Sequence, residues 1–396
     1  MTTLAIAALA LVALTWVGYP LIAALVSRRR PPPRDRTATR PVARAVSVVL
    51  ATRDTPAAVA ARVSDLLTTT HPRELLEIVV AVDATVASGL ADYAALLPNT
   101  VRVVPGDPPG GKAVTLNAGV RAATSGLVIF ADSGQSFDPE AIPQLVTFLA
   151  NGTFGAVSGA YRAAEAGQSP LLRAFWWLET RIRRAEAHLD SLVAVTGAIY
   201  AIRRSLWRPL PPGLICDDLY VPLHVAASGY RVGFCEAALA SDPRTFDRRQ
   251  EFSRKVRTLT GMLQMCRWCP WILSPVQNPV WIQFVCHKLL RLATPYLLLV
   301  ALAGLARVGE GAGRSAALWP AGAWVLAAAA LAAILRPAAA RRILHQLGWA
   351  LSLQAAPLVA TLNAVRGRWD VWRPAAPPPT PLPPASSVHL RTAAAE

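Results

Sequence analysis

The chain has 396 residues, of which 53% are hydrophobic, and its mean hydropathy of +0.36 excludes an ordinary soluble enzyme. The net charge of +16 favours anionic partners. Because Arg is concentrated beside apolar segments, we expect membrane phosphates rather than nucleic acid as those partners. The cysteines include one isolated CxxC (Cys266–Cys269) without a neighbouring His, which indicates neither a disulfide framework nor a zinc site.

The first apolar segment is Leu4–Val26, which carries no charge and is long enough to cross ~30 Å of hydrocarbon. It exceeds the roughly 7–15 apolar residues of a signal peptide, and its Arg cluster follows the apolar run instead of preceding it. We therefore expect a retained transmembrane helix over residues 1–27 and a basic, Pro-rich linker over 28–41. By the positive-inside rule, this linker places the following domain in the cytoplasm.

From residue 42 to 260 the pattern changes to short apolar strands that alternate with amphipathic stretches. Ala45–Ala51 and Leu76–Asp83 are rich in β-branched residues and almost wholly apolar, which predicts buried parallel strands. Thr55–Thr69 between them is a predicted helix, so the three segments form a βαβ unit. The same alternation continues to Asp132. We predict an α/β domain with a nucleotide-sized crevice at the carboxyl ends of its strands.

The C-terminal part contains three more apolar segments, Leu289–Ala306, Ala316–Leu335 and Leu347–Val365. We expect an interfacial segment over 261–288, a membrane region of two to three spans over 289–366, and a Pro-rich tail over 367–396. With three spans after a cytoplasmic domain, the basic sequence RGRWDVWR would lie outside the cell, against the positive-inside rule. The conflict disappears if the last segment is re-entrant or if WILSPVQNPVWIQFVC also enters the bilayer. The number of spans stays open, but the pattern predicts a multi-pass protein of the cell (inner) membrane.

Two predicted strands end on an acid, Asp83 and Asp132. Such acids can bind a base or ribose, or hold a divalent cation that bridges phosphates, and each can alternatively cap the next helix. A metal that binds a nucleotide normally needs two acids at such a strand end. Here Asp132 supplies one of them, and Gly134 stands where the second acid is expected. We interpret Asp138 as the N-cap of a helix with Pro139 at its first position, rather than as the missing acid.

Two predicted helix starts carry charged residues. Lys112 follows the turn PPGG, and a helix start of this kind can hold an anion. Asp217 and Asp218 begin a later helix, where a pair of carboxylates either complements the helix dipole or presents a general base. Both interpretations of the acid pair stay open on composition alone.

The order of seven motifs is more specific than any one of them: SVVLATRD, EIVVAVD, GGKAVTLNAG, VIFADSGQ, VTGAIYAIRRSLW, CDDLYVPLHVAASGYRV and EFSRKVRTLTG. In this order they resemble membrane-bound family 2 glycosyltransferases, the relatives of the cellulose, hyaluronan and poly-N-acetylglucosamine synthases. The resemblance covers about Val42 to Arg291 and the flanking apolar segments. It implies a cytoplasmic GT-A domain, a nucleotide-sugar donor (usually a UDP-sugar), inversion at the anomeric carbon and a divalent cation, Mg²⁺ or Mn²⁺.

The resemblance also implies roles for single residues. Asp83 matches the acid that reads the nucleotide, and Lys112 lies where the Gly-Lys turn approaches the diphosphate. Asp132 matches the first acid of the DxD motif, the metal ligand. Asp218 matches the catalytic base of the ED motif, with Asp217 in place of the usual Glu.

The family's QxxRW motif has two candidates here. QMCRW (264–268) fits the letters, whereas RKVRT (254–258), which closely precedes a Gly, fits the family's local context. We favour Arg257 for the contact with the donor diphosphate and keep Arg267 and Trp268 as alternates. With RKVRT as the motif, the Trp that supports the acceptor is missing, which argues against a processive enzyme.

Three hypotheses follow. The chain is a transferase that extends a glycan or glycosylates a lipid carrier, with an export or accessory subunit as a possible partner. It is alternatively a transferase that makes a single addition to a lipid or polyprenyl phosphate. The third hypothesis is a non-catalytic membrane scaffold or export subunit with a degenerate transferase domain, which Gly134 and the altered QxxRW motif suggest.

Overall fold

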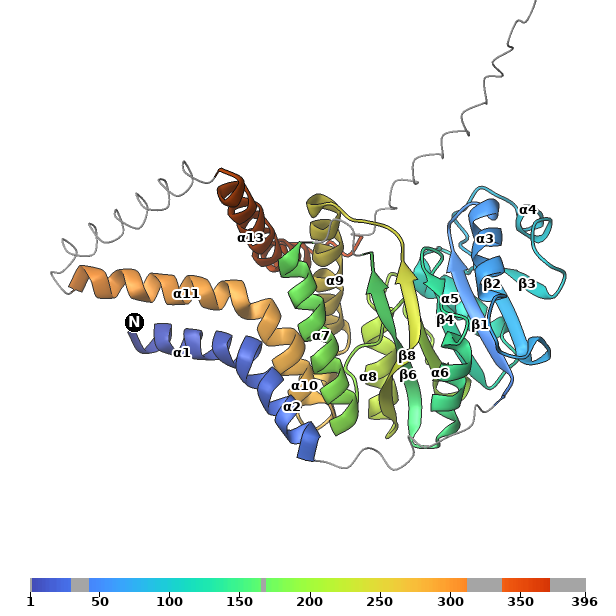
Figure 1. Cartoon of the computed structure of the whole chain (residues 1–396), viewed down its shortest axis with the longest axis horizontal. Coiled ribbons are helices and arrows are strands. Elements are labelled where there is room, and N and C mark those ends of the chain that lie inside the picture. Colours follow the sequence, from blue (N-terminus) through green and yellow to red (C-terminus); the bar gives the residue numbers. More distant parts are fainter. Residues whose placement is uncertain (1, 30–42, 165–168, 312–336, 371–396) are drawn as a thin grey trace, which may run out of the picture.

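The computed structural model describes residues 2–29, 43–164, 169–311 and 337–370 (Figure 1). Most of the predicted linker 28–41, the predicted span Ala316–Leu335 and most of the predicted tail 367–396 lie outside these residues. The described part consists of an α/β domain and a set of long helices on one side of it (Figure 1).

The α/β domain contains an eight-stranded mixed sheet with the strand order β3-β2-β1-β4-β7-β6-β8-β5. The strands are β1 (Val46–Thr52), β2 (Leu76–Val82), β3 (Val101–Pro105), β4 (Leu127–Ala131), β5 (Ser136–Phe137), β6 (Phe154–Ala163), β7 (Ile199–Arg203) and β8 (Arg231–Asp242). Strands β1 to β4 pair in parallel, as predicted, whereas β7 is antiparallel to β4 and β6. The carboxyl ends of β2, β1 and β4 therefore lie at one edge of the sheet, where an open α/β sheet binds its ligand.

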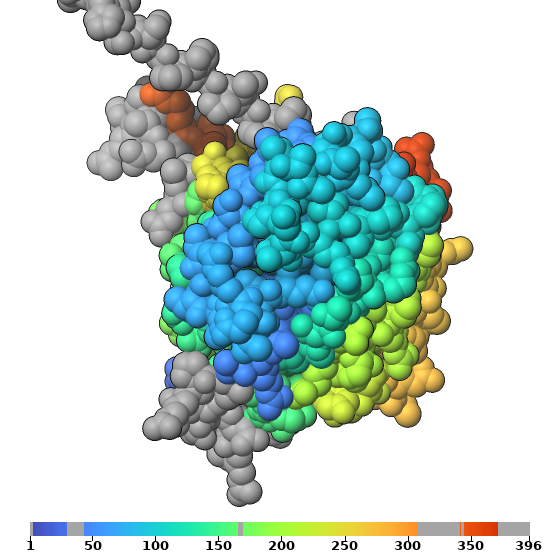
Figure 2. All heavy atoms as spheres, turned by 90° about the vertical axis from the view of Figure 1, so that its right-hand side faces the viewer, coloured from blue at the N-terminus to red at the C-terminus, as the bar shows by residue number. Residues whose placement is uncertain are grey.

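Helices pack on both faces of this sheet. They are α3 (Pro56–Leu66), α4 (Leu90–Ala94), α5 (Lys112–Ala122), α6 (Ala141–Ala150), α7 (Pro170–Leu189), α8 (Asp217–Ala227) and α9 (Arg248–Trp268). Alternate residues of β1 enter different cores: Val48 and Leu50 pack with α3 and α6, and Val49 packs with α5 and α8. Burial on both faces explains why β1, β2 and β4 are almost wholly apolar, whereas the outer strand β3 is only partly buried. The segment from β1 to α6 forms most of the face turned away from the long helices (Figure 2).

The start of α6 corrects one prediction. The helix begins at Ala141, its N-cap residue is Glu140, and no side chain caps it. Asp138 is not the N-cap, because the helical hydrogen bonds begin at the carbonyl of Glu140, which accepts from the N–H of Gln144 at 3.1 Å. Asp138 still belongs to the extended chain, and its backbone N–H donates to the carbonyl of Leu239 next to the β5–β8 pairing. The helix starts only three residues after Asp138, at Ala141.

Two helical segments are long and apolar enough to cross a membrane by length and composition, Thr3–Arg29 and Trp281–Arg307. The first comprises α1 (Thr2–Ala13), a π-helical turn (Leu14–Gly18) and α2 (Tyr19–Arg29); the second comprises α10 (Trp281–Gln283), a π-helical turn (Phe284–Leu289) and the start of α11 (Leu290–Gly311). They lie side by side (Figure 1). The second segment begins earlier than the predicted span, so the predicted interfacial segment ends inside a long helix.

The predicted span Leu347–Val365 lies within α13 (Pro337–Val365) and is not one of these two segments. The helix packs along α9 (Figure 1). A hydrogen bond of 3.4 Å joins Asn363 to Thr260, and Ser169 at the start of α7 donates to Gln346 at 2.6 Å. These polar contacts attach α13 to the α/β domain.

A buried group of polar and charged side chains joins the long helices to the α/β domain. Glu186 on α7 accepts a hydrogen bond of 2.6 Å from the Tyr19 hydroxyl, and its Oε1 lies 2.9 Å from Nδ1 of His287. The other ring nitrogen of His287 lies 2.9 Å from Oε2 of Glu179, which also pairs with Arg291 at 2.7 Å. Because these groups are buried, the hydrogen bonds and ion pairs between them form only when the helices dock in this register.

Candidate active site

The acids predicted at the strand ends occupy the same edge of the sheet. Asp83 follows β2 and Asp132 follows β4, and these strands flank β1. Lys112 begins α5, and Asp217 begins α8. The structure therefore brings four residues that are distant in the sequence to one region, as the parallel topology predicts.

Asp83 is 3% exposed, and its carboxylate is bound by the chain itself. Oδ1 accepts hydrogen bonds from the backbone and hydroxyl of Thr85, at 2.9 and 2.7 Å. Oδ2 accepts from Nε of Arg53 at 2.9 Å and from the backbone N–H of Gly111 at 2.6 Å. Burial acts to raise the pKa of Asp83, but these hydrogen bonds outweigh it and lower the pKa to about 2. Asp83 thus fixes the turn that precedes Lys112.

That turn depends on two glycines with positive φ, Gly110 at 89° and Gly111 at 103°. A Cβ atom at Gly110 would lie 2.6 Å from Cγ2 of Thr85 and 2.8 Å from Oδ1 of Asp83. A Cβ atom at Gly111 would meet nothing within 4 Å. The close approach of the turn to Asp83 therefore needs glycine at position 110 for space as well as for conformation.

We expect Gly110→Ala to lower the free energy of unfolding by about 1–3 kcal/mol more than Gly111→Ala does, because only the first adds a steric clash to the backbone strain. Thermal unfolding of the two purified variants measures the difference. Equal melting temperatures would show that the contact with Asp83 and Thr85 does not restrict the turn.

Lys112 links two of the acids. Its ammonium nitrogen lies 3.2 Å from Oδ1 of Asp132 and 3.4 Å from Oδ1 of Asp217. Burial acts to lower the pKa of Lys112, but the charges of Asp132, Asp217 and Asp218 outweigh it and raise the pKa. Lys112 therefore stays protonated at neutral pH, as a binding site for an anionic group requires.

The two acids at the start of α8 have different surroundings. Asp217 is 5% exposed, and its Oδ2 is buried without a hydrogen-bond partner among the described residues. Asp218 is partly exposed. Burial and then the charge of Asp217 raise the pKa of Asp218 to about 6, against the opposing charges of Lys112, Lys288 and Arg257. A carboxylate with a pKa near neutrality suits a general base, because it is ionised at working pH and still accepts a proton.

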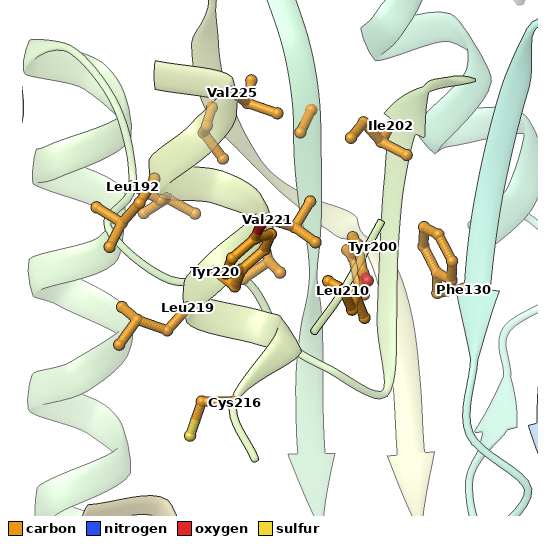
Figure 3. Close-up of a cluster of buried hydrophobic side chains, with 14 of the residues drawn as sticks. Phe130, Leu192, Tyr200, Ile202, Leu210, Cys216, Leu219, Tyr220, Val221 and Val225 are labelled. Atoms are coloured by element: carbon orange, nitrogen blue, oxygen red, sulfur yellow. The ribbon is translucent and has the colours of Figure 1, made fainter. Parts of the chain in front are cut away.

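Helix α8, which carries this acid pair, is packed against the hydrophobic core of the domain. Val221 and Val225 belong to a buried cluster with Tyr200 of β7 and Phe130 of β4 (Figure 3). The rings of Phe130 and Tyr200 stack with their centroids 4.5 Å apart. The backbone oxygen of Asp218 accepts from the N–H of Val195 at 2.9 Å. Rigid packing of this kind fixes the direction in which the acids point.

The two candidates for the QxxRW motif lie on one helix, α9, with different contacts. Arg257 is close enough to Asp218 for its charge to lower the pKa of that carboxyl. Gln264 is buried, accepts from the N–H of Ile215 and donates to the carbonyl of Gly213, both at 2.9 Å. Arg267 is exposed. Within the RKVRT segment, Arg257 is therefore the residue whose charge acts on Asp218, and Gln264 of the other segment holds the loop before the acids.

The surroundings of Asp132 determine how a divalent cation could bind. Its side chain pairs with Lys112, and Gly134 supplies no second carboxylate. No group of three His, Cys, Asp or Glu side chains that could hold a metal occurs among the described residues. Mg²⁺ or Mn²⁺ fits here only as an ion bound through one carboxylate, phosphate oxygens and water.

Some residues of the site were missed by the sequence analysis. Arg53 and Thr115 both bind the carboxylate of Asp83, the latter at 3.3 Å. Arg244 lies against Gly134, and Gln264 supports the acid pair. Arg53 lies two residues after the predicted strand Ala45–Ala51, which was an available signal, whereas the contact of Arg244 depends on tertiary structure.

A sequence model of the family described as "Glycosyltransferase like family 2" matches residues 43–268. The fold is similar to that of the mannosyltransferase PcManGT from Pyrobaculum calidifontis, solved with GDP-Man and Mn²⁺, with a TM-score of 0.67 and 22% identity over 92% of this chain and 99% of that chain. Glucosyl-3-phosphoglycerate synthase from Mycobacterium tuberculosis aligns with a TM-score of 0.41 and 19% identity over 57% of this chain and 80% of that chain. No curated protein sequence matches the chain significantly.

Proposed function

Because this chain belongs to the glycosyltransferase-like family 2, we propose that it is an integral-membrane inverting glycosyltransferase. It transfers a hexosyl or N-acetylhexosaminyl group from a nucleotide-sugar to a growing glycan or a lipid-linked acceptor. The observation that carries this proposal is the cluster at the strand ends, in which Lys112 lies between Asp132 and Asp217 beside a partly exposed Asp218. The cluster combines a carboxylate that can act as a general base, Asp218, with a cation that can bind the leaving diphosphate, Lys112.

In the proposed reaction the carboxylate of Asp218 accepts the proton of the acceptor hydroxyl. The acceptor oxygen forms a bond to the anomeric carbon while the bond from that carbon to the donor diphosphate breaks, which inverts the configuration. Lys112 and Arg257 hold the leaving diphosphate by charge. A divalent cation (Mg²⁺ or Mn²⁺) held by Asp132 would, when bound, neutralise further charge on the diphosphate. Asp83 acts on the nucleotide side, where it fixes the turn before Lys112 and is proposed to contact the nucleotide.

The nucleotide of the donor is the finer part of the proposal. The sequence resemblance favours a UDP-sugar, and the structural relative from Pyrobaculum calidifontis was solved with GDP-Man. A screen of UDP- and GDP-sugars with purified full-length protein, with mass spectrometry of the lipid and glycan products, identifies donor and acceptor together. We expect transfer from one donor class; no transfer from any nucleotide-sugar would contradict the proposal.

A membrane location agrees with the two long apolar segments and with the exposure of many of their large side chains, including Leu21 and Leu302. We propose that they anchor the enzyme in the cell (inner) membrane, as a multi-pass protein with its α/β domain in the cytoplasm. The acceptor then approaches from the membrane or from a glycan held beside it. A partner for export stays a prediction.

A non-catalytic membrane scaffold is the second candidate, because Gly134 replaces the second acid of the DxD motif. Turnover decides between the two. Sugar transfer by the wild-type protein that Asp218→Asn abolishes supports the enzyme, whereas nucleotide binding without transfer supports the scaffold.

A further inference from the structure

Gly134 leaves room for an arginine. A Cβ atom at this position would lie 2.5 Å from Nη2 of Arg244, so no residue with a side chain fits there unless the guanidinium moves. In a DxD motif the second acid would extend from this Cβ position. The structure therefore places a cation where the metal-binding carboxylate of the motif is absent.

Arg244 is held in place by a buried acid at the end of β8. Its Nε and Nη2 donate to the two oxygens of Asp242, both at 2.8 Å, and its backbone N–H donates to Oδ1 at 3.0 Å. Asp242 is buried and accepts further hydrogen bonds of 3.0 Å from Gln135 and Tyr161. A bidentate pair on a fixed carboxylate orients the guanidinium and leaves little freedom to lose when a ligand binds.

The guanidinium also has capacity for a second anion. Its side chain is 46% exposed, and Nη1 has no hydrogen-bond partner within the described part of the chain. Asp132 lies near enough for its charge to act on Arg244, and Lys112 pairs with the same acid at 3.2 Å. Two cations therefore flank Asp132, which is a charge pattern for a ligand with at least two negative groups.

We propose that Arg244 binds the diphosphate of the nucleotide-sugar at the position of the missing second DxD acid, so that donor binding depends on a fixed guanidinium and only weakly on a divalent cation. The inference rests on the proposed function, since it names a further contact of the same donor. Arg suits this position because its planar fork binds carboxylate on one side and phosphate on the other.

Binding of GDP and UDP to the purified full-length protein tests the inference without turnover. Calorimetry is done once in EDTA and once with Mn²⁺, on wild type, Arg244→Gln, Arg244→Lys and Gly134→Ala. We expect wild type to bind in EDTA, and Arg244→Gln to weaken that binding by roughly 10- to 100-fold, the range for a lost charge-assisted hydrogen bond. Mn²⁺ is expected to restore part of the affinity that Arg244→Gln loses. The affinity of Arg244→Lys should lie between those of wild type and Arg244→Gln.

Gly134→Ala gives an independent result, because the added methyl group displaces the guanidinium of Arg244 while the arginine itself remains in the chain. It should weaken binding in EDTA in the same direction as Arg244→Gln. Arg184→Gln is the matched control, since Arg184 forms an exposed ion pair with Glu236 of β8, the strand that ends at Asp242. This variant should bind GDP and UDP as tightly as wild type does.

Two negative outcomes are distinct. If wild type binds neither GDP nor UDP in either condition, the proposed function fails. If wild type binds and both Arg244→Gln and Gly134→Ala bind equally well in EDTA, with melting temperatures that show a folded protein, the role of Arg244 is wrong and the proposed function stands.

Discussion

Replacing Asp218 with asparagine is expected to lower the turnover number by about 10²- to 10⁴-fold, the range for loss of a general base. Asparagine keeps the size of the side chain but cannot accept the acceptor proton. Nucleotide binding should be retained, because the predicted diphosphate contacts come from other residues. The measurement is sugar transfer in single-turnover assays with saturating donor.

A matched control is Asp138→Asn, which removes an exposed carboxylate six residues after Asp132 in the sequence. The hydrogen bonds of Asp138 to the rest of the chain come from its backbone. It should transfer at the wild-type rate. Wild-type turnover by Asp218→Asn would remove this residue from the role of base and leave Asp217 as the acid to examine.

The pH dependence of the wild-type enzyme provides a second test of Asp218. Only the ionised carboxylate accepts a proton, and its pKa is raised to about 6, so kcat/KM should increase with pH through about 6. Lys112 opposes this rise in pKa. In Lys112→Gln the midpoint should therefore move to higher pH, which a profile of kcat/KM between pH 5 and 8 for both proteins measures. An unchanged midpoint would mean that Lys112 does not act on the base.

The second large effect is expected for Asp83→Asn, which we predict to lower the free energy of unfolding by about 2 kcal/mol at neutral pH, since the native pKa of about 2 lies below the ordinary value of 3.8. The sign follows from the depressed pKa: the stabilisation is present above pH 3.8 and is lost as the pH falls through about 2. Transfer should fall as well, because the N–H of Gly111 loses its charged acceptor and the turn before Lys112 loosens.

Thermal unfolding in detergent measures this effect. Asp107→Asn is the control, because Asp107 forms a more exposed ion pair with Arg121 near the same turn and should contribute no more than about 1 kcal/mol. If the two variants melted at the same temperature, the buried hydrogen bonds of Asp83 would not be a main source of stability in the turn.

The parallel half of the sheet was predictable from the sequence for a physical reason. Strands buried on both faces must be apolar along their whole length, and the resulting short runs in β1, β2 and β4 stand out between amphipathic helices. The acids that end β2 and β4 could be placed together because parallel strands share an edge. The start of α8 at Asp217 was predicted as well, since acids favour the first turn of a helix.

What the sequence could not provide are contacts between distant segments. The side chain of Arg244 meets Gly134 only because β8 and β5 pair at the edge of the sheet, and neither residue has a local signal for this contact. The same pairing explains the wrong prediction for Asp138, whose neighbours Pro139 and Glu140 have the composition of a helix start. The choice between the two QxxRW candidates depends on which side of α9 faces the acids, a property that motif letters do not encode.

The buried charges that join α2 to α7 and α11 have a mechanical consequence for acceptor choice. Glu186 and His287 tie the apolar helices to the α/β domain, so the domain cannot rise or tilt without exposing unpaired charge. The proposed base, Asp218, is therefore expected to keep a fixed position relative to the apolar helices. Under the proposed function, we therefore expect a lipid-anchored acceptor to need a spacer of matching length between the lipid and its accepting oxygen.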